Sequence, residues 1–494
     1  MDTTVATRAA NQSYREVLGN RQIAGLLLGD LLANVGTGMI IVAMPVQTLS
    51  IHGSVPPAIA IGLVEAAPFV LSTILALAIG LGRVRVSPRT LLIADCVLRS
   101  LTFATLGALA LTEQLTLPVL IVGLLFGSTF RLAGSSSRRL LATSVAGESG
   151  RFAVNGLIGL NATFALYIVG PVLGGVIVAV TSAGVALFFD ACGAVILLVA
   201  VLVSVPRAAN DRDALRRPRD RAPESGWRIL RRRPVAARLL VVVFFFNFFY
   251  MPIEVALPLY VRGTLDADAS GLGLMWGALG VGAFVGATFV NQLRNLPQRQ
   301  VLIAIIGLWA MCPIALAFVG NLPLALIVFG LGGLVWAPFT PVAYSFLQSG
   351  VKPHEQQQVV TLWTTGATVA APLGLMVGGP LIELAGSTGG LALSGGLTLV
   401  LLPIAALAVL SRARVIPHFT RNTSSDNRYS TVRRQRNREE EWGGTPAALG
   451  SAGATWHDFE GDQQTRRSGT PARPRTATSR PRPHRSGVRA AAGR

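Results

Sequence analysis

The sequence has few of the residues from which catalytic and metal sites are built. Three cysteines and five histidines occur among 494 residues. Cys96, Cys192 and Cys312 lie inside apolar stretches without CxxC or metal-ligand spacing, so we expect small core residues, no metal and no cofactor. No histidine lies in an apolar stretch and no paired acidic motif occurs, which argues against a membrane-embedded enzyme. No GxxxxGK[ST] loop occurs, so ATP is not the expected energy source.

Acidic residues are also scarce. The chain has 24 Asp and Glu against 43 Lys and Arg, a net charge of +19. In a soluble protein this excess would indicate a nucleic-acid partner. Here it lies between and after the apolar stretches, so we expect contact with anionic lipid headgroups at the cytoplasmic face and no nucleic acid.

Long apolar stretches dominate what the sequence does contain. About twelve of them reach the roughly 20 residues that a helix needs to cross a bilayer. They cover residues 23–47, 58–82, 90–112, 117–134, 152–180, 184–205, 238–261, 270–293, 300–320, 322–347, 358–384 and 388–410. The first is full length and follows a polar segment, so we expect it to stay in the membrane and not to be a cleaved signal peptide. The sequence predicts an all-α, multi-pass membrane protein.

Arginine indicates the orientation. Arginines gather before the first stretch and in the even-numbered gaps, as at Arg83 and Arg89 or at Arg138 and Arg139, whereas the odd-numbered gaps hold few. Because basic residues stay on the cytoplasmic side, we predict that both termini are cytoplasmic, in the plasma membrane.

Changes in composition divide the chain. The expected parts are a cytoplasmic segment 1–22, a six-helix bundle 23–205, a cytoplasmic linker 206–237, a second six-helix bundle 238–411 and a basic cytoplasmic tail 412–494. A short surface helix around Trp227 is expected at the end of the linker. The tail is rich in Arg, Pro, Ser, Thr and Gly, and we expect it to be disordered.

The two bundles resemble each other. Asn34 and Asn247 are each followed, at the same spacing, by a V-A-x-P run that ends at Pro45 or Pro258. This match favours internal duplication. Helical spacing places polar residues on one stripe in each repeat: Asp30, Asn34 and Thr37 in the first, and Asn247, Tyr250 and Glu254 in the second. Charge facing lipid is costly, so we expect both stripes to face an interior between the bundles.

Three motifs carry a family resemblance. The fifth stretch holds Asn155 and then Gly170-Pro171-Val172-Leu173-Gly174-Gly175, which is similar to the GPxxGG antiporter motif; Ala94 to Arg99 resembles an aDllR run; and Ala371 to Pro380 adds a Gly- and Pro-rich stretch. Over about residues 20–411 the chain resembles the major facilitator superfamily, in particular its exporters of macrolides, multiple drugs and enterobactin-type siderophores. The resemblance implies two pseudo-symmetric six-helix bundles that rock about a central site and drive substrate out as protons enter.

The motif residues have more than one interpretation. Gly170, Pro171, Gly174 and Gly175 could form the bent, close helix contact of an antiporter or only ordinary membrane packing. Asp95 and Arg99 are four residues apart, which allows a salt bridge. In this family that pair implies a lock near the inner gate, and the alternative is a pair that neutralises two charges.

Departures from the family weaken the coupling prediction. The loop from Gly80 to Arg89 reads GLGRVRVSPR and lacks the acid of the family pattern. Gly123 stands where some drug/proton antiporters carry an arginine, and we interpret Arg131 as a topology anchor near the cytoplasmic interface. Proton coupling therefore depends on the resemblance and on acids within apolar stretches.

The candidate coupling acids are Asp30, Glu65 and Glu254, since a carboxyl group moved between wet and dry surroundings can take up and release a proton. Glu254 is the first choice. Glu65 could instead reach the interface, and Asp190 and Glu383 are interpreted as interfacial.

The candidate substrate cavity contains Asn34, Thr37, Asn247, Tyr250 and Trp336, with Trp276 and Trp363 as further aromatics. Such a cavity suits amphipathic organic molecules, neutral or cationic, although aromatics in membrane helices also face lipid. We expect a monomeric exporter. A nutrient importer or facilitator, and a membrane-anchored sensor or scaffold, are the alternatives.

Overall fold

The computed structural model describes residues 12–80, 83–84, 86–205, 226–293, 296–352 and 355–410. The tail, most of the linker and the first eleven residues of the expected N-terminal segment lie outside these ranges. Every regular element within them is a helix. The first group of helices is α1 (Tyr14–Gly19), α2 (Arg21–Ile51), α3 (Pro57–Gly80), α4 (Pro88–Leu111), α5 (Leu117–Gly127), α6 (Arg131–Asn161), the π-helix η1 (Ala162–Val169), α7 (Gly170–Val180) and α8 (Ala183–Ser204).

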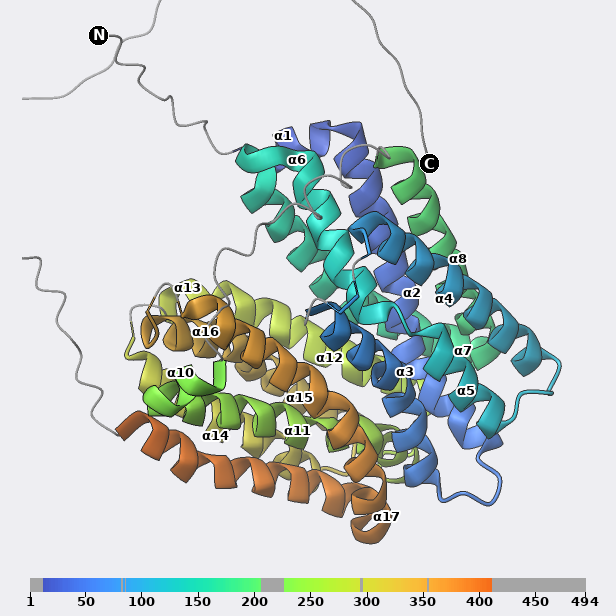
Figure 1. Ribbon diagram of the computed structural model, residues 1–494. Coiled ribbons are helices and arrows are strands. Elements are labelled where there is room, and N and C mark those ends of the chain that lie inside the picture. The colour runs from blue at the N-terminus through green and yellow to red at the C-terminus, as the bar shows by residue number, and fades with distance from the viewer. Residues whose placement is uncertain are drawn as a thin grey trace, which may run out of the picture. The chain divides into compact units, whose positions relative to one another are not determined.

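The second group follows the linker (Figure 1). It consists of α10 (Gly226–Arg232), α11 (Pro234–Gly263), α12 (Ala269–Thr288), α13 (Val290–Leu293), α14 (Gln298–Leu316), α15 (Leu322–Trp336), α16 (Phe339–Ser349) and α17 (Gln356–Leu410). Apolar side chains dominate both groups of helices.

Ten helical segments of the described chain are long and apolar enough to cross a membrane. Two of them, Leu117–Val180 and Gln358–Ala406, are 64 and 49 residues long, more than twice what one crossing needs. Each long segment contains a glycine with positive φ, Gly147 at 68° and Gly386 at 74°, where the helix is interrupted. Glycine adopts this backbone conformation without the steric penalty that a Cβ imposes.

Two further breaks divide helices within single expected spans. Residues 128–130 separate α5 from α6, and Ala337 with Pro338 separates α15 from α16. Pro338 lacks the N–H that a continuous helix would use. The breaks fall in the expected fourth and tenth spans, so they occupy corresponding places in the two proposed repeats.

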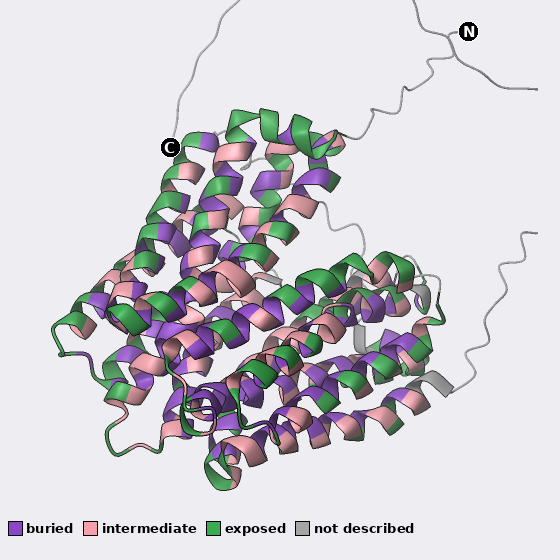
Figure 2. Cartoon of the chain, turned by 180° about the vertical axis from the view of Figure 1, so that it is seen from behind, coloured by how far each residue is buried: buried purple, intermediate pink, exposed green. Residues whose placement is uncertain are grey.

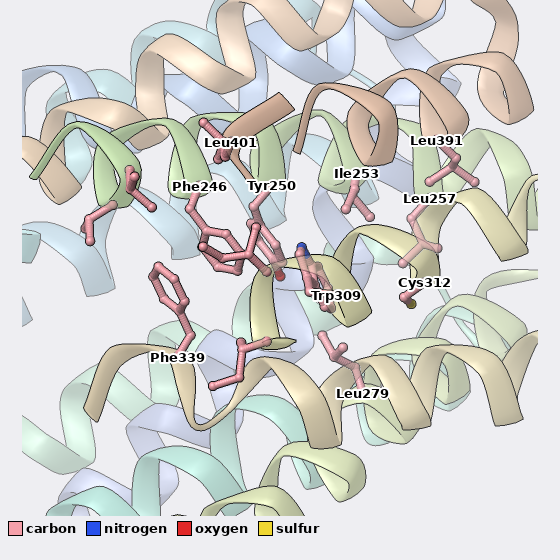
Figure 3. Packing of buried hydrophobic residues seen from close by; sticks show 14 of the residues in the cluster. Phe246, Tyr250, Ile253, Leu257, Leu279, Trp309, Cys312, Phe339, Leu391 and Leu401 are labelled. Carbon is pink, nitrogen blue, oxygen red and sulfur yellow. The ribbon is translucent and has the colours of Figure 1, made fainter. Parts of the chain in front are cut away.

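Exposed side chains are often apolar, as expected where helices face lipid. Phe152, Phe318 and Leu384 are 79%, 85% and 90% exposed. Figure 2 shows exposed residues along the outer faces of the helices and buried ones between them. The largest buried cluster joins α10, α11, α12, α14, α15, α16 and α17 and also takes in residues of α2 and α3; it includes Phe246, Tyr250, Trp309 and Phe339 (Figure 3).

The expected helix at the end of the linker is present as α10, and its Arg228, Arg231 and Arg232 are exposed. Ile229 and Leu230 are buried in the cluster that contains α11 and α17. Beside it, Arg233 forms an ion pair with the buried Glu355 at 3.3 Å. The helix thus packs its two apolar side chains inward, which removes apolar surface from water, and keeps its arginines exposed.

Candidate functional site

The polar stripe of α2 lies inside the first group of helices. Asp30 and Asn34 are buried. Arg138 of α6 forms an ion pair with Asp30, and its Nη1 lies 3.5 Å from Oδ1 of Asn34. The sequence pattern predicts Arg138 in the gap after the fourth stretch; in the structure it lies on the helix α6. The helix α6 continues far beyond residue 134, and Asp30 neutralises the charge of this arginine within the first group of helices.

A second buried ion pair lies one turn along the same stripe. Arg99 of α4 donates to both carboxylate oxygens of Asp190 on α8, with Nε 2.8 Å from Oδ2. The same guanidinium donates to the hydroxyl of Thr37 and to the carbonyl of Ala33. Two parallel N–H···O bonds are the strong bidentate form of this interaction.

This pair corrects two expectations. Asp190 is not interfacial, because it is 0% exposed. Arg99 does not pair with Asp95 among the described ion pairs, because Asp190 takes its donors. The close packing of α8 on α2 explains why: a methyl group at Gly36 would lie 2.8 Å from the Cα of Asp190, so the acid reaches the depth of Arg99.

Asp95 lies apart from this pair. Its side chain is buried against Gly134 of α6, and its Oδ1 has no hydrogen-bond partner in the described residues. Arg99, Arg138 and Arg131 are nevertheless within electrostatic range of the carboxyl group. Small residues allow this approach, since a methyl group at Gly134 would lie 2.5 Å from Oδ2 of Asp95.

Glu65 and Glu254 form the centre of the candidate site. Glu65 is on α3 and Glu254 on α11, so the two carboxyl groups come from different groups of helices, and each interacts electrostatically with the other. Arg131 interacts with both. Its guanidinium carbon lies 4.7 Å from the ring centre of Phe69, one turn along α3 from Glu65.

The position of Arg131 overturns the prediction of a topology anchor. The residue begins α6 directly after the break at residues 128–130, inside the long apolar segment Leu117–Val180. Gly127 ends α5 just before that break, but glycine is frequent in membrane helices, so the sequence carried no clear signal for it. The 30 residues from Leu117 to the kink at Gly147 were the available clue, because they exceed one straight span.

Aromatic rings surround this centre. Trp336 stacks on Tyr250 with ring centres 5.8 Å apart, and Trp309 lies 5.6 Å from Tyr250. Tyr167 of η1 meets the edge of Trp336 at 6.5 Å. Tyr250 and Trp336, two of the predicted cavity residues, therefore lie side by side, but neither lines the two cavities described below; Trp309 and Tyr167 were not among the candidates. Figure 3 shows Tyr250 and Trp309 facing each other within the cluster.

Other candidates are placed less centrally. The side-chain amide of Asn247 donates to the carbonyl of Val243 on its own helix at 2.8 Å. The side-chain amide of Asn155 likewise donates to the backbone carbonyl of Arg151 at 2.9 Å. Trp276 packs edge-on against Phe329 within the hydrophobic cluster.

The GPxxGG residues form close helix contacts. Gly170 and Gly174 face α2, where added methyl groups would lie 2.6 Å from the Cα atoms of Gly38 and Met39. Gly175 faces α12, and a methyl group there would lie 2.7 Å from the carbonyl oxygen of Ala269. The motif thus joins α7 to one helix of each group, through backbone contact that only glycine permits.

Two cavities lie between the groups. One of about 280 Å³ is lined by Phe69 and Leu132 on one side and by Trp363, Thr364 and Thr368 of α17 on the other. A larger one, of about 400 Å³, is lined by α2 and by residues 258–272. We take the smaller as the candidate substrate cavity, because Phe69 and Leu132 adjoin Glu65 and Arg131.

Known proteins resemble this chain in sequence and in fold. Residues 18–439 match the MFS_3 family, described as a transmembrane secretion effector. The chain is 31% identical over 372 residues to the multidrug efflux pump Tap of Mycolicibacterium fortuitum, covering 73% of this chain and 89% of that protein. It is 24% identical to macrolide efflux protein A of Streptococcus pyogenes, over 47% of this chain and 58% of that one.

Solved structures share the fold at low sequence identity. The nucleoside transporter NupG superposes with a TM-score of 0.61 at 12% identity, covering 79% of this chain and 99% of that one. The human organic anion transporter MFSD10 gives a TM-score of 0.55 at 16% identity, over 80% and 100% of the two chains.

Proposed function

Because the chain belongs to the MFS_3 family of major facilitator transporters, we propose that it is a proton-coupled exporter of small amphipathic organic molecules. It is a multi-pass membrane transporter and not an enzyme. The efflux relatives support the direction of transport. The proposed topology has twelve crossings of the plasma membrane, with both termini cytoplasmic. Ten helical segments are long and apolar enough to cross, and the kinks at Gly147 and Gly386 would divide the two longest of them into two crossings each.

The contacts between the two groups support alternating access. A methyl group at Gly62, near the start of α3, would lie 2.8 Å from the carbonyl oxygen of Leu375 on α17. Gly175, near the end of α7, meets Gly273, near the start of α12. In the proposed orientation both contacts lie toward the outer surface. The groups would be closed there and would separate when the site opens outward.

A shared arginine is the observation that carries the coupling proposal. Glu65 and Glu254 lie on opposite groups of helices, and Arg131 is the cation that interacts with both. When the groups separate, Glu254 leaves Arg131 behind on α6. An ionised carboxylate without a partner costs roughly 2.5–3.5 kcal/mol near the middle of a span, so proton uptake by Glu254 would accompany the movement.

The test is transport into inverted vesicles with an imposed pH gradient, with ethidium, erythromycin and a siderophore as probes. Glu254→Gln should abolish gradient-driven accumulation and leave protein abundance near normal. The matched control is Glu113→Gln, an exposed acid in a loop, which should accumulate the probe as the unmodified protein does. Accumulation of every transported probe that persists after the gradient is collapsed would refute proton coupling.

A further inference from the structure

The fifth expected span contains a π-helix where a continuous α-helix would be simplest. Residues Ala162–Val169 form η1, between α6 and the GPxxGG helix α7. π-helical turns, with hydrogen bonds from i to i+5, are rare and are frequently found at functional sites. The wider turn gives a looser hydrogen-bond ladder than that of an α-helix. The segment is anchored at its start, where the amide of Asn161 donates to the carbonyl of Leu27 on α2 at 3.0 Å.

Glycines pack against the backbone of η1 from both groups of helices. On the α2 side, a methyl group at Gly38 would lie 2.7 Å from the carbonyl oxygen of Leu166. On the α12 side, a methyl group at Gly280 would lie 2.2 Å from the carbonyl oxygen of Tyr167. The π-helix is therefore held between the first group and the second through contacts that tolerate no side chain.

Tyr167 crosses the same boundary with its side chain. Its ring meets the edge of Trp336 on α15, and Trp336 stacks on Tyr250 of α11. The Tyr167 hydroxyl group is also within electrostatic range of Glu254 and Arg131. Tyr167 thus contacts the second group of helices twice. Its ring contacts Trp336, next to the site of Glu65, Glu254 and Arg131 (the carboxylate site), and its carbonyl oxygen contacts Gly280 of α12.

We propose that Tyr167 is a positioning residue that links the carboxylate site to the contact between η1 and α12. The proposal rests on the transport function above. When Glu254, Trp336 or Tyr250 moves on binding a proton or substrate, the ring of Tyr167 moves with them. The looser ladder of η1 lets its carbonyl shift against Gly280 while α6 and α7 stay intact, which releases or restores the contact between the groups.

Transport kinetics test this role. Tyr167→Leu removes the edge contact, and an aromatic pair contributes about 0.5–1.5 kcal/mol, so we expect the maximum rate of ethidium export to fall by up to about tenfold with KM within about twofold. Tyr167→Phe keeps the ring and should restore the rate. Phe164→Leu is the matched control, because Phe164 lies on the same π-helix and is 51% exposed. Equal rates for Tyr167→Leu and Phe164→Leu would overturn the proposal.

A distance measurement separates this proposal from proton coupling. Spin labels at Arg139→Cys and Arg299→Cys, both exposed and on different groups, report the separation of the helices in a Cys192→Ser background. In the labelled protein that keeps Tyr167, and in Tyr167→Phe, we expect the distribution of label distances to differ between acidic and alkaline pH. In Tyr167→Leu, we expect the same distribution at both pH values. An unchanged response in Tyr167→Leu would overturn the link, even if vesicle transport is coupled to protons.

A glycine substitution tests the backbone half of the link. Gly280→Ala should shift the same label distances toward the separated form, because its methyl group cannot fit against the Tyr167 carbonyl. Gly396→Ala is the control, since nothing lies within 4 Å of a methyl group there. Identical distributions for the two alanine variants would show that the contact of η1 with α12 does not control the movement.

Discussion

The ion pair between Arg99 and Asp190 should dominate the stability of the first group of helices. Arg99→Leu removes the guanidinium and leaves the Asp190 carboxylate, which is 0% exposed, without its bidentate partner. Removing one partner of a buried pair costs about 3–5 kcal/mol, because the remaining charge stays in a poorly polarisable interior. The lost hydrogen bonds to Thr37 and to the Ala33 carbonyl act in the same direction.

The double variant Arg99→Leu, Asp190→Leu should recover most of that loss, since no charge is then left unpaired. Apolar replacement of a whole buried pair is often neutral or stabilising. The interaction energy from the double-mutant cycle should therefore reach at least about 2 kcal/mol.

Unfolding in mixed micelles of mild detergent and dodecyl sulfate would measure these free energies. Arg139→Leu is the surface control, because Arg139 is exposed on α6. Its effect should stay within about 0.5 kcal/mol. The reasoning fails if Arg99→Leu destabilises no more than this control, or if the double variant is as unstable as the single one.

Three further predictions concern a helix cap, a helix contact and the tail. Asp268 caps α12 by accepting from the N–H groups of Ser270 and Gly271, so Asp268→Ala should cost about 0.5–2 kcal/mol of unfolding free energy. The hydrogen bond from the Ser270 hydroxyl lowers the pKa of Asp268, so a pH titration of stability should show the cap contribution complete above the ordinary aspartate pKa and lost as the pH falls through the lower folded-state value. Gly282→Ala would bring a methyl group within 1.8 Å of a carbonyl oxygen on α15, so its yield after detergent extraction should fall well below that of Gly396→Ala. Deleting residues 420–494 should leave most of the transport rate in vesicles. A complete loss of transport in that variant would favour the alternative that the protein is a membrane-anchored sensor or scaffold.

Sequence patterns located the helices well because apolar length has one physical meaning in a membrane. A run of about 20 apolar residues must satisfy its own backbone hydrogen bonds, and a helix does this within one segment. The same patterns could not show where a helix breaks. Residues 128–130 carry neither glycine nor proline, and Arg131 was therefore placed at the membrane surface.

Pairing of charges was harder to predict than their presence. Helical spacing correctly put Asp30, Asn34 and Thr37 on one stripe, and both arginines that bind this stripe come from other helices. Asp95 is the near neighbour of Arg99 in sequence, and Asp190 is its partner in space, 91 residues away. Local spacing measures reach along one helix, and the packing of α8 against α2 through small residues decides the partner.

The distribution of charge indicates which acids are free to take part in coupling. Asp30 and Asp190 each form an ion pair with an arginine of their own, and both pairs lie within the first group of helices, which moves as a unit in the proposed cycle. Glu65 and Glu254 have one arginine between them and lie on different groups. Only the second arrangement changes when the groups separate. Asp30 is therefore the weakest of the three coupling candidates, and replacing it should damage folding more than the pH dependence of transport.

The segment from Gly80 to Arg89, which lacks the acid of the family pattern, also makes its contact within one group of helices. Arg89, a basic residue from that loop, donates to the carbonyl of Val205 at the end of α8 at 3.2 Å, which is a contact inside its own group of helices. The carbonyl oxygen that accepts this hydrogen bond is neutral and belongs to the first group, so the contact of Arg89 does not join the two groups. In the second group, Arg233 and Glu355 form an ion pair with each other, so this contact also lies within a single group. Both of these inner contacts lie within single groups, so in the proposed cycle the balance between the two states depends on contacts that join the groups: the outer glycine contacts, the contact of η1 with α12, and Arg131 with its two acids.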